Sequence, residues 1–194
     1  MRPKSKPNDS PETAGIPSAV ARLIRLRTEN IYRTRQLLCT EAVLTVINQG
    51  LRGDLPADLA VRLASGLPEG LSGSGCLCGA LNGGALAIGL FLGRSGPGIH
   101  TNRNVRQATR DLHERFRERY GSTCCRILTR QVVYGSSAHF DHCAGLTGTA
   151  AELAAGIILE HRPELARNAD LDYLNRKDSL LGAGVRRFAR AVTT

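Results

Sequence analysis

Apolar residues recur at helical spacing over most of the chain, and no two segments show the strict alternation that is typical of paired strands. Glycine, proline or a polar capping residue bounds each periodic segment. The pattern predicts an all-α fold, a compact helical bundle of about five to six helices joined by glycine-rich loops. The predicted helices cover 18–49 with a break near Asn30, 56–66, 78–92, 102–120 and 142–160.

The same pattern divides the chain into three parts. Residues 1–17 are polar and proline-rich, which predicts a flexible tail, and residues 18–162 form the helical part that holds the cysteines. Residues 163–194 read as a basic extension. No signal-like apolar segment lies near the start, and the most apolar stretch, 77–92, is too short and glycine-rich to span a bilayer. We therefore expect a cytoplasmic protein with no membrane span.

Composition sharpens the picture of the core and of the partners. There is no Trp, one Met and 21 Gly, so the helices must pack through small and aliphatic side chains. The net charge is +9, carried almost entirely by Arg. These arginines are spread along the chain with few aromatic residues beside them, which argues against nucleic-acid binding. A basic surface would instead suit docking to an acidic partner protein.

Six cysteines carry the candidate chemistry. Without a secretory signal, structural disulfides are not expected, and a metal, a cluster or redox chemistry is favoured. Ser122 is the predicted cap of a further short helix that contains Cys124 and Cys125. Cys78, Cys125 and Cys143 thus each fall in or next to the first turn of a predicted helix, where unpaired N–H groups and the helix dipole favour thiolate. Cys39 is predicted in the middle of a helix, on its apolar face. We expect these four side chains to converge on one buried site.

Two glycines follow Cys78 at helical spacing. Gly79 and Gly83 are four residues apart and so lie on one face of the helix that Cys78 opens. Their missing side chains would let a bulky cluster approach the backbone, which makes both glycines candidate cofactor-binding residues. The alternative is helix packing through small residues alone.

The remaining cysteines are less easily assigned. Cys76 forms a CxC with Cys78 and is a possible further metal ligand. Cys124 and Cys125 are adjacent, so both cannot face one site without strain, and one of them is expected to be a bystander.

Two histidines stand near the last cysteine. His139 and His142 precede Cys143 in the sequence HFDHC, a density that would permit metal ligation. A capping loop with solvated or hydrogen-bonded histidines is the alternative that we favour.

The segment CGALNG, residues 78–83, resembles the motif of a family of redox-active proteins with CGAxxG and four characteristic cysteines. The flanking segments LCTEAVL and FRERYGSTCCRIL also resemble that family, and the resemblance covers about residues 30–162. It identifies the four characteristic cysteines as Cys39, Cys78, Cys125 and Cys143. Cys76 and Cys124 are additional, and Ala144 stands where the family often has proline.

The resemblance implies a helical domain with a redox role, often suspected near transport systems. A related domain in split-Soret cytochromes is associated with an iron–sulfur centre. This comparison favours an iron–sulfur cluster, or another thiolate-bound metal, with the four characteristic cysteines as ligands and residues 66–75 supplying N–H groups. The alternatives are metal-free thiol–disulfide or sulfur-carrier chemistry, with Cys78 as the nucleophile, and a zinc-stabilised structural module. Expected partners are a redox protein, a transport-system component or a second copy of the chain.

Overall fold

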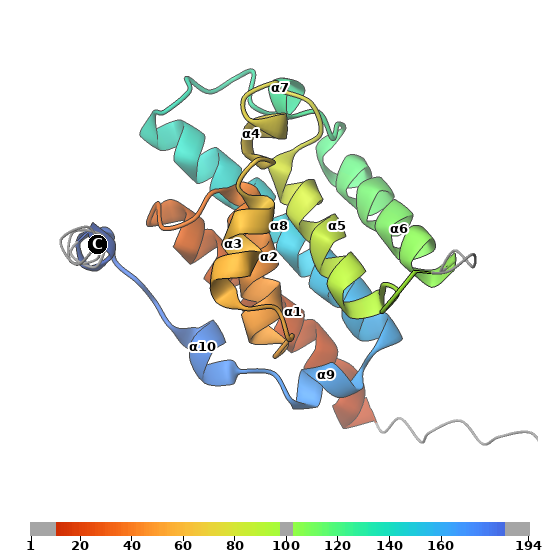
Figure 1. Ribbon diagram of the computed structural model, residues 1–194. Coiled ribbons are helices and arrows are strands. Elements are labelled where there is room, and N and C mark those ends of the chain that lie inside the picture. The colour runs from red at the N-terminus through yellow and green to blue at the C-terminus, as the bar shows by residue number, and fades with distance from the viewer. Residues whose placement is uncertain (1–10, 98–102, 185–194) are drawn as a thin grey trace, which may run out of the picture.

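The computed structural model describes residues 11–97 and 103–184 and confirms the all-α prediction: these residues form ten helices and no strand. The longer helices run side by side, while α4 and α7 lie together across one end of them (Figure 1). The helices are α1 (Pro11–Arg33), α2 (Cys39–Gly50), α3 (Ala57–Ala64), α4 (Pro68–Leu71), α5 (Gly79–Leu92), α6 (Arg103–Tyr120), α7 (Cys125–Leu128), α8 (Ser137–His161), α9 (Glu164–Arg167) and α10 (Leu171–Asn175).

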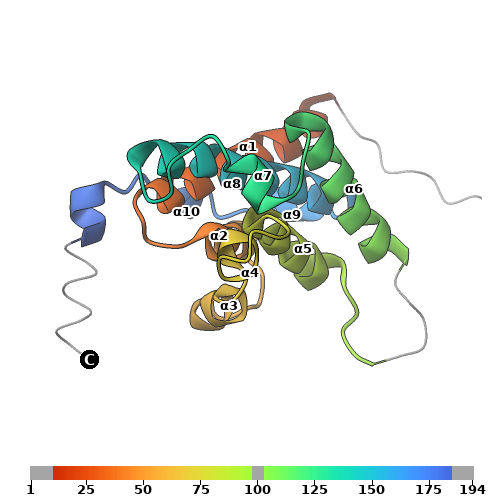
Figure 2. The same cartoon turned by 90° about the horizontal axis from the view of Figure 1, so that it is seen from above.

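Helix α8 is the centre of the bundle. It packs against α1, α2, α5 and α6, which surround it in the view from above (Figure 2). Its alanines, glycines and threonines are buried on several sides, so neighbouring helices can approach closely. Among the described helices, α8 alone is long and apolar enough to cross a membrane, and 67% of its apolar window is buried inside the bundle. That burial is typical of a core helix.

Glycine positions bring α5 against its neighbours. A Cβ atom added at Gly83 would lie 2.7 Å from the Thr40 carbonyl oxygen and 2.8 Å from the Val43 Cβ, both on α2. A Cβ added at Gly84 would lie 2.7 Å from Leu112 on α6. The structure therefore uses these glycines for close helix packing.

Three helix boundaries differ from the sequence prediction. Helix α1 begins at Pro11, inside the segment predicted to be a flexible tail, and continues past Asn30 to Arg33. The chain then turns at residues 34–38, where Arg35 has a left-handed backbone. Helix α8 begins at Ser137 rather than at His142, because the Ser136 hydroxyl caps it by accepting from the His139 N–H at 3.1 Å.

The segment after α8 is fastened to α1. The Arg27 guanidinium is buried, pairs with the Asp178 carboxylate at 2.9 Å and donates to the Arg176 carbonyl at 2.9 Å. It also lies 5.1 Å from the centre of the Tyr173 ring. Asn30 donates to the Asp178 carbonyl at 2.9 Å. These contacts fix the described part of the predicted basic extension on the bundle; residues 185–194 of that extension, and residues 1–10 of the predicted tail, lie outside the described ranges.

We refer to α4, α7 and the connecting segments 72–78 and 129–136 as the cap. Helix α4 contacts α7, α5 and α2, and the two short helices lie together at the end of the bundle where α5 begins (Figure 1). The Tyr134 hydroxyl donates to the Glu69 carboxylate at 2.6 Å, and this bond ties the second connecting segment to α4. The cap thus closes one end of the bundle.

Candidate functional site

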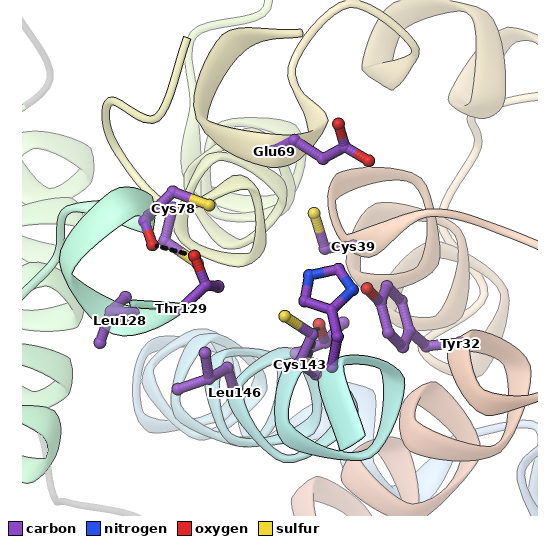
Figure 3. A pocket seen from close by; sticks show the side chains of 11 residues that line it. Tyr32, Cys39, Glu69, Cys78, Leu128, Thr129, Cys143 and Leu146 are labelled. Carbon is purple, nitrogen blue, oxygen red and sulfur yellow. Dashed lines mark hydrogen bonds between the residues drawn. The ribbon is translucent and has the colours of Figure 1, made fainter. Parts of the chain in front are cut away.

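The four cysteines that the sequence singled out line one pocket beneath the cap. Their side chains come from four different elements: the start of α2, the residue before α5, the start of α7 and the interior of α8. Figure 3 shows the labelled cysteines around a common space. The pocket is lined by Tyr32, Cys39, Glu69, Cys78, Cys125, Leu128, Thr129, His139, Cys143, Leu146 and Thr147.

A short antiparallel pairing aligns two of these cysteines. Leu77 and Cys124 form an isolated β-bridge. The Cys78 N–H donates to the Thr123 carbonyl at 2.8 Å, and the Cys125 N–H donates to the Cys76 carbonyl at 2.6 Å. Cys78 then precedes α5, and Cys125 is the first residue of α7. The predicted positions of these two cysteines at helix starts are therefore confirmed.

The two additional cysteines do not line the pocket. Cys76 is the exposed member of the six. The Cys124 thiol donates to the Gly75 carbonyl at 3.1 Å, so it is directed to a backbone oxygen outside the pocket. Of the adjacent pair, only Cys125 reaches the pocket, as the adjacency argument predicted.

The position of Cys39 within its helix was predicted wrongly. Cys39 is the first residue of α2 rather than a mid-helix residue, because the turn at residues 34–38 separates α1 from α2. Hydrogen bonding from the backbone N–H groups of Glu69 and Thr40 partly offsets the rise in the pKa of this thiol that burial causes. The loop 66–75 therefore supplies a backbone N–H to a pocket sulfur.

The position of Cys143 was also predicted wrongly. Because α8 begins six residues earlier, at Ser137, Cys143 lies in the second turn and not at the helix start. The helix N-terminus therefore does not act on this thiol as expected. Instead the Tyr32 hydroxyl, from α1, hydrogen-bonds to the Cys143 sulfur and partly offsets the effect of burial on its pKa. Tyr32 itself is buried.

The pocket favours neutral thiols over thiolates. Burial raises the pKa of Cys125 to about 11 and that of Cys143 to about 12, and it also raises the pKa values of Cys39 and Cys78. Among the described residues, no Lys or Arg lines the pocket. Burial lowers the pKa of His139, so this ring is neutral near pH 7. The charged group that does line the pocket, the Glu69 carboxylate, disfavours a second negative charge.

Three pocket residues were missed by, or left open in, the sequence analysis. Tyr32 comes from α1, where no motif marks it. Glu69 lies in a Gly/Pro segment, and nothing in that segment of the sequence indicated that its side chain lines the cysteine pocket. Its backbone is left-handed, with φ of 58°. His139 is buried at the pocket wall, whereas His142 is exposed and contacts the Leu128 carbonyl at 2.8 Å. Only long-range packing brings these side chains to the pocket.

The two candidate glycines have different surroundings. A Cβ added at Gly79 would lie 2.5 Å from the Cys39 sulfur and 2.8 Å from the Thr40 hydroxyl. Gly79 therefore lets α5 begin directly against a pocket thiol. Gly83 faces the backbone of α2, one turn farther from the pocket.

The donor set has the chemistry of a thiolate-bound metal centre, since four soft ligands face one space. In the described ranges, however, no group of three or more His, Cys, Asp or Glu side chains is arranged to hold a metal ion. The cavity itself is small, about 30 Å³. Binding of a metal centre would therefore require the lining side chains to reorient. The four thiols would be the ligands. The cap forms one wall of the pocket, and its two helices, α4 and α7, are only four residues long each.

The model of the family described as "Putative redox-active protein (C_GCAxxG_C_C)" matches residues 37–157, more than half of the chain. The match begins just before α2 and ends within α8, so it contains every cysteine. No curated protein and no solved structure matches the chain.

Proposed function

The chain belongs to this family of redox-active proteins, and from that premise we propose that it holds an iron–sulfur cluster for electron transfer. The observation that carries the proposal is that four thiols from separate elements line one buried pocket. Thiolates are the usual ligands of such clusters, commonly four of them. The proposed ligands are Cys39, Cys78, Cys125 and Cys143.

The electrostatics of the pocket favour a metal over free thiol chemistry. A thiol nucleophile must be deprotonated, and burial raises the pKa of all four thiols. The described lining contains no cation that would stabilise a thiolate, and the Glu69 carboxylate opposes one. A bound metal supplies the missing positive charge and displaces the thiol protons. The same burial that makes these cysteines poor nucleophiles therefore suits them to a metal centre.

Other groups of the chain would donate hydrogen bonds to the ligating sulfurs. Backbone N–H groups of Glu69 and Thr40 approach the Cys39 sulfur, and the Tyr32 hydroxyl approaches the Cys143 sulfur. Hydrogen bonds to ligating sulfurs, together with exclusion of water, set the potential of a cluster. A bound cluster would supply the one-electron couple.

Two other functions remain as alternatives with distinct signatures. Metal-free thiol–disulfide or sulfur-carrier chemistry is supported by the position of Cys78 at the start of α5, where the Ala80 N–H partly offsets the rise in its pKa. A zinc-stabilised module is chemically compatible with four thiols, but zinc has no redox chemistry of its own, which fits a redox-active family poorly.

The test is anaerobic purification and cluster reconstitution, followed by visible absorption and by iron and acid-labile sulfide analysis. We expect visible bands together with iron and sulfide in the wild type. Serine substitution of any one of the four pocket cysteines should lower the iron content. Cys124→Ser is the matched control, since Cys124 adjoins Cys125 but does not line the pocket. Protein that stays colourless and iron-free after reconstitution would overturn the proposal, and zinc alone would favour the structural module.

A further inference from the structure

The cap places the exposed Cys76 directly across from the pocket cysteine Cys125. Leu77 and Cys124 are the bridged pair, so the preceding residue on one segment faces the following residue on the other. The hydrogen bond of 2.6 Å from the Cys125 N–H to the Cys76 carbonyl joins these two backbones directly.

The geometry of such a pairing permits a disulfide. Cys76 and Cys125 form a hydrogen-bonded antiparallel pair, in which the two Cα atoms are about 5.5 Å apart. A disulfide spans Cα separations of about 4.4–6.8 Å. Cys125 is the first residue of α7, so a disulfide forms once the two side chains turn toward each other across this backbone hydrogen bond.

The surroundings of Gly70 show how closely the two cysteines approach. A Cβ added there would lie 2.6 Å from the Cys76 nitrogen and 2.8 Å from the Cys125 Cβ. The Cys76 backbone and the Cys125 side chain therefore both pack against Gly70, where no room is left for a side chain. Cys124 is held elsewhere, since its thiol donates to the Gly75 carbonyl at 3.1 Å.

The two thiols differ in their access to solvent. Cys76 is exposed, whereas Cys125 is half-buried and lines the pocket. An oxidant in solution therefore meets Cys76 first, and Cys125 is the pocket thiol directly across from it.

We propose that Cys76 and Cys125 are partners in a reversible disulfide, formed by exchange with a low-molecular-weight disulfide such as glutathione disulfide. The Cys76 thiolate attacks one glutathione sulfur, which forms a mixed disulfide and releases one glutathione thiol. The Cys125 thiolate, which is a minor form because burial raises the pKa of this thiol, then attacks the adjacent Cys76 sulfur and releases the second glutathione. Two protein thiols lose two electrons and two protons, and glutathione disulfide becomes two molecules of glutathione.

The consequence for the pocket rests on the proposed function. A disulfide to Cys76 engages one of the four cluster ligands, so oxidised protein would be unable to assemble a fully ligated cluster. Conversely, a bound cluster would hold Cys125 and protect it from exchange. Cys76 would then be an oxidant-sensing thiol that controls cluster loading.

The experiment treats reduced, metal-free protein with limiting glutathione disulfide, blocks the remaining thiols with N-ethylmaleimide and maps the disulfides by mass spectrometry without reduction. We expect a peptide pair joined through Cys76 and Cys125. The link should be lost in Cys76→Ser and in Cys125→Ser and retained in Cys124→Ser, the matched control. Linkage of Cys76 to Cys78 or Cys124, or glutathione adducts without an internal link, would overturn the proposal.

A second measurement separates this inference from the proposed function. Oxidised wild-type protein should lose most of its capacity to take up iron and sulfide, and dithiothreitol should restore it. If the reduced protein takes up no iron while the Cys76–Cys125 link still maps, the cluster proposal fails and the disulfide stands. If the oxidised, mapped protein takes up iron as fully as the reduced protein, the control of loading is refuted.

Discussion

The body of the bundle (α1, α2, α5, α6 and α8) and the cap are stabilised in different ways. In the body, aliphatic and small side chains such as Val43, Ile88 and Ala150 are completely buried. In the cap, α7 buries no residue, and Glu69, Leu71 and Ser72 all have left-handed backbones. Backbone hydrogen bonds and a few side-chain contacts hold the cap in place. The body therefore has the larger share of apolar burial, which is the main source of stability.

The pocket lies where these two regions meet. Cys39 and Cys143 come from the body, whereas Cys78, Cys125 and Glu69 come from the cap. Segments with little apolar burial open locally at a lower free energy than the core. Of the four pocket cysteines, two are thus held by the body and two belong to the cap, so local opening of the cap would move Cys78 and Cys125 relative to Cys39 and Cys143.

The largest expected effect tests the body. In Gly83→Ala the new Cβ would meet the backbone oxygen of Thr40 and the Cβ of Val43, neither of which can move without shifting α2. We expect a loss of about 1–3 kcal/mol in the free energy of unfolding, measured by urea denaturation followed by circular dichroism. Gly89→Ala, in the same helix but with nothing within 4 Å of the new Cβ, should instead stabilise by about 0.5–1 kcal/mol. Equal effects of the two substitutions would contradict this account of the packing.

The same substitution in the cap should have a different result. Gly70→Ala places a Cβ 2.6 Å from the Cys76 nitrogen at a residue with φ of 70°. We expect the strain, about 1–3 kcal/mol, to open the cap locally rather than to unfold the bundle. Alkylation of Cys125 and Cys78 by N-ethylmaleimide should accelerate several-fold, while the urea midpoint falls less than in Gly83→Ala. A parallel fall in the global midpoint with no gain in alkylation would show that cap and body unfold together.

A smaller effect on the free energy of unfolding is expected from pH, because the thiols of the pocket have raised pKa values. The pKa values of Cys125 (about 11) and Cys143 (about 12) exceed the ordinary value of 9.0. Above pH 9 the unfolded chain loses these protons before the folded chain does. The stability of metal-free protein should therefore be complete below about pH 9 and fall as pH rises toward those values. Urea titrations at pH 7 to 10.5 would measure the slope, and Cys143→Ser should flatten it; an unchanged slope would show that Cys143 does not contribute.

The smallest expected effect comes from the exposed edge of the cap. Tyr134→Phe removes the hydroxyl that donates to Glu69 but keeps the ring, which lies 5.0 Å from the His139 ring. We expect a loss of no more than about 1 kcal/mol in global stability. Hydrogen exchange of the amides in 68–72 should nevertheless increase, whereas exchange in α8 should not. Increased exchange in both segments would mean that the bond stabilises the whole bundle.

The sequence predicted the helices of the body better than the residues at which those helices begin. Periodic apolar residues placed the helical cores correctly, because their burial depends on local spacing. The starts of α2 and α8 were predicted wrongly. The left-handed turn at Arg35 and the N-capping hydrogen bond of Ser136 set these starts, and both have weak sequence signals. The family resemblance identified the four pocket cysteines, while the predicted helix positions were right for Cys78 and Cys125 and wrong for Cys39 and Cys143; the structure brings all four to one pocket.

The surroundings of those cysteines were not predictable from the sequence. Tyr32 and Glu69 reach Cys143 and Cys39 through contacts between elements far apart in the chain. Nothing in the residues near either one marks it as a pocket residue. The raised pKa values of the thiols likewise depend on burial and on the lack of a Lys or Arg among the described lining residues. Both properties exist only in the folded chain.

The ion pair between Arg27 and Asp178 imposes an order on biosynthesis. The two residues are 151 positions apart, so a ribosome adding about 5–20 residues per second reaches Asp178 roughly 8–30 s after Arg27. The fastening of α1 is therefore among the last contacts that a nascent chain can make. Every residue that lines the pocket is synthesised before Asp178, so this fastening adds the C-terminal segment to a chain that already contains the whole site.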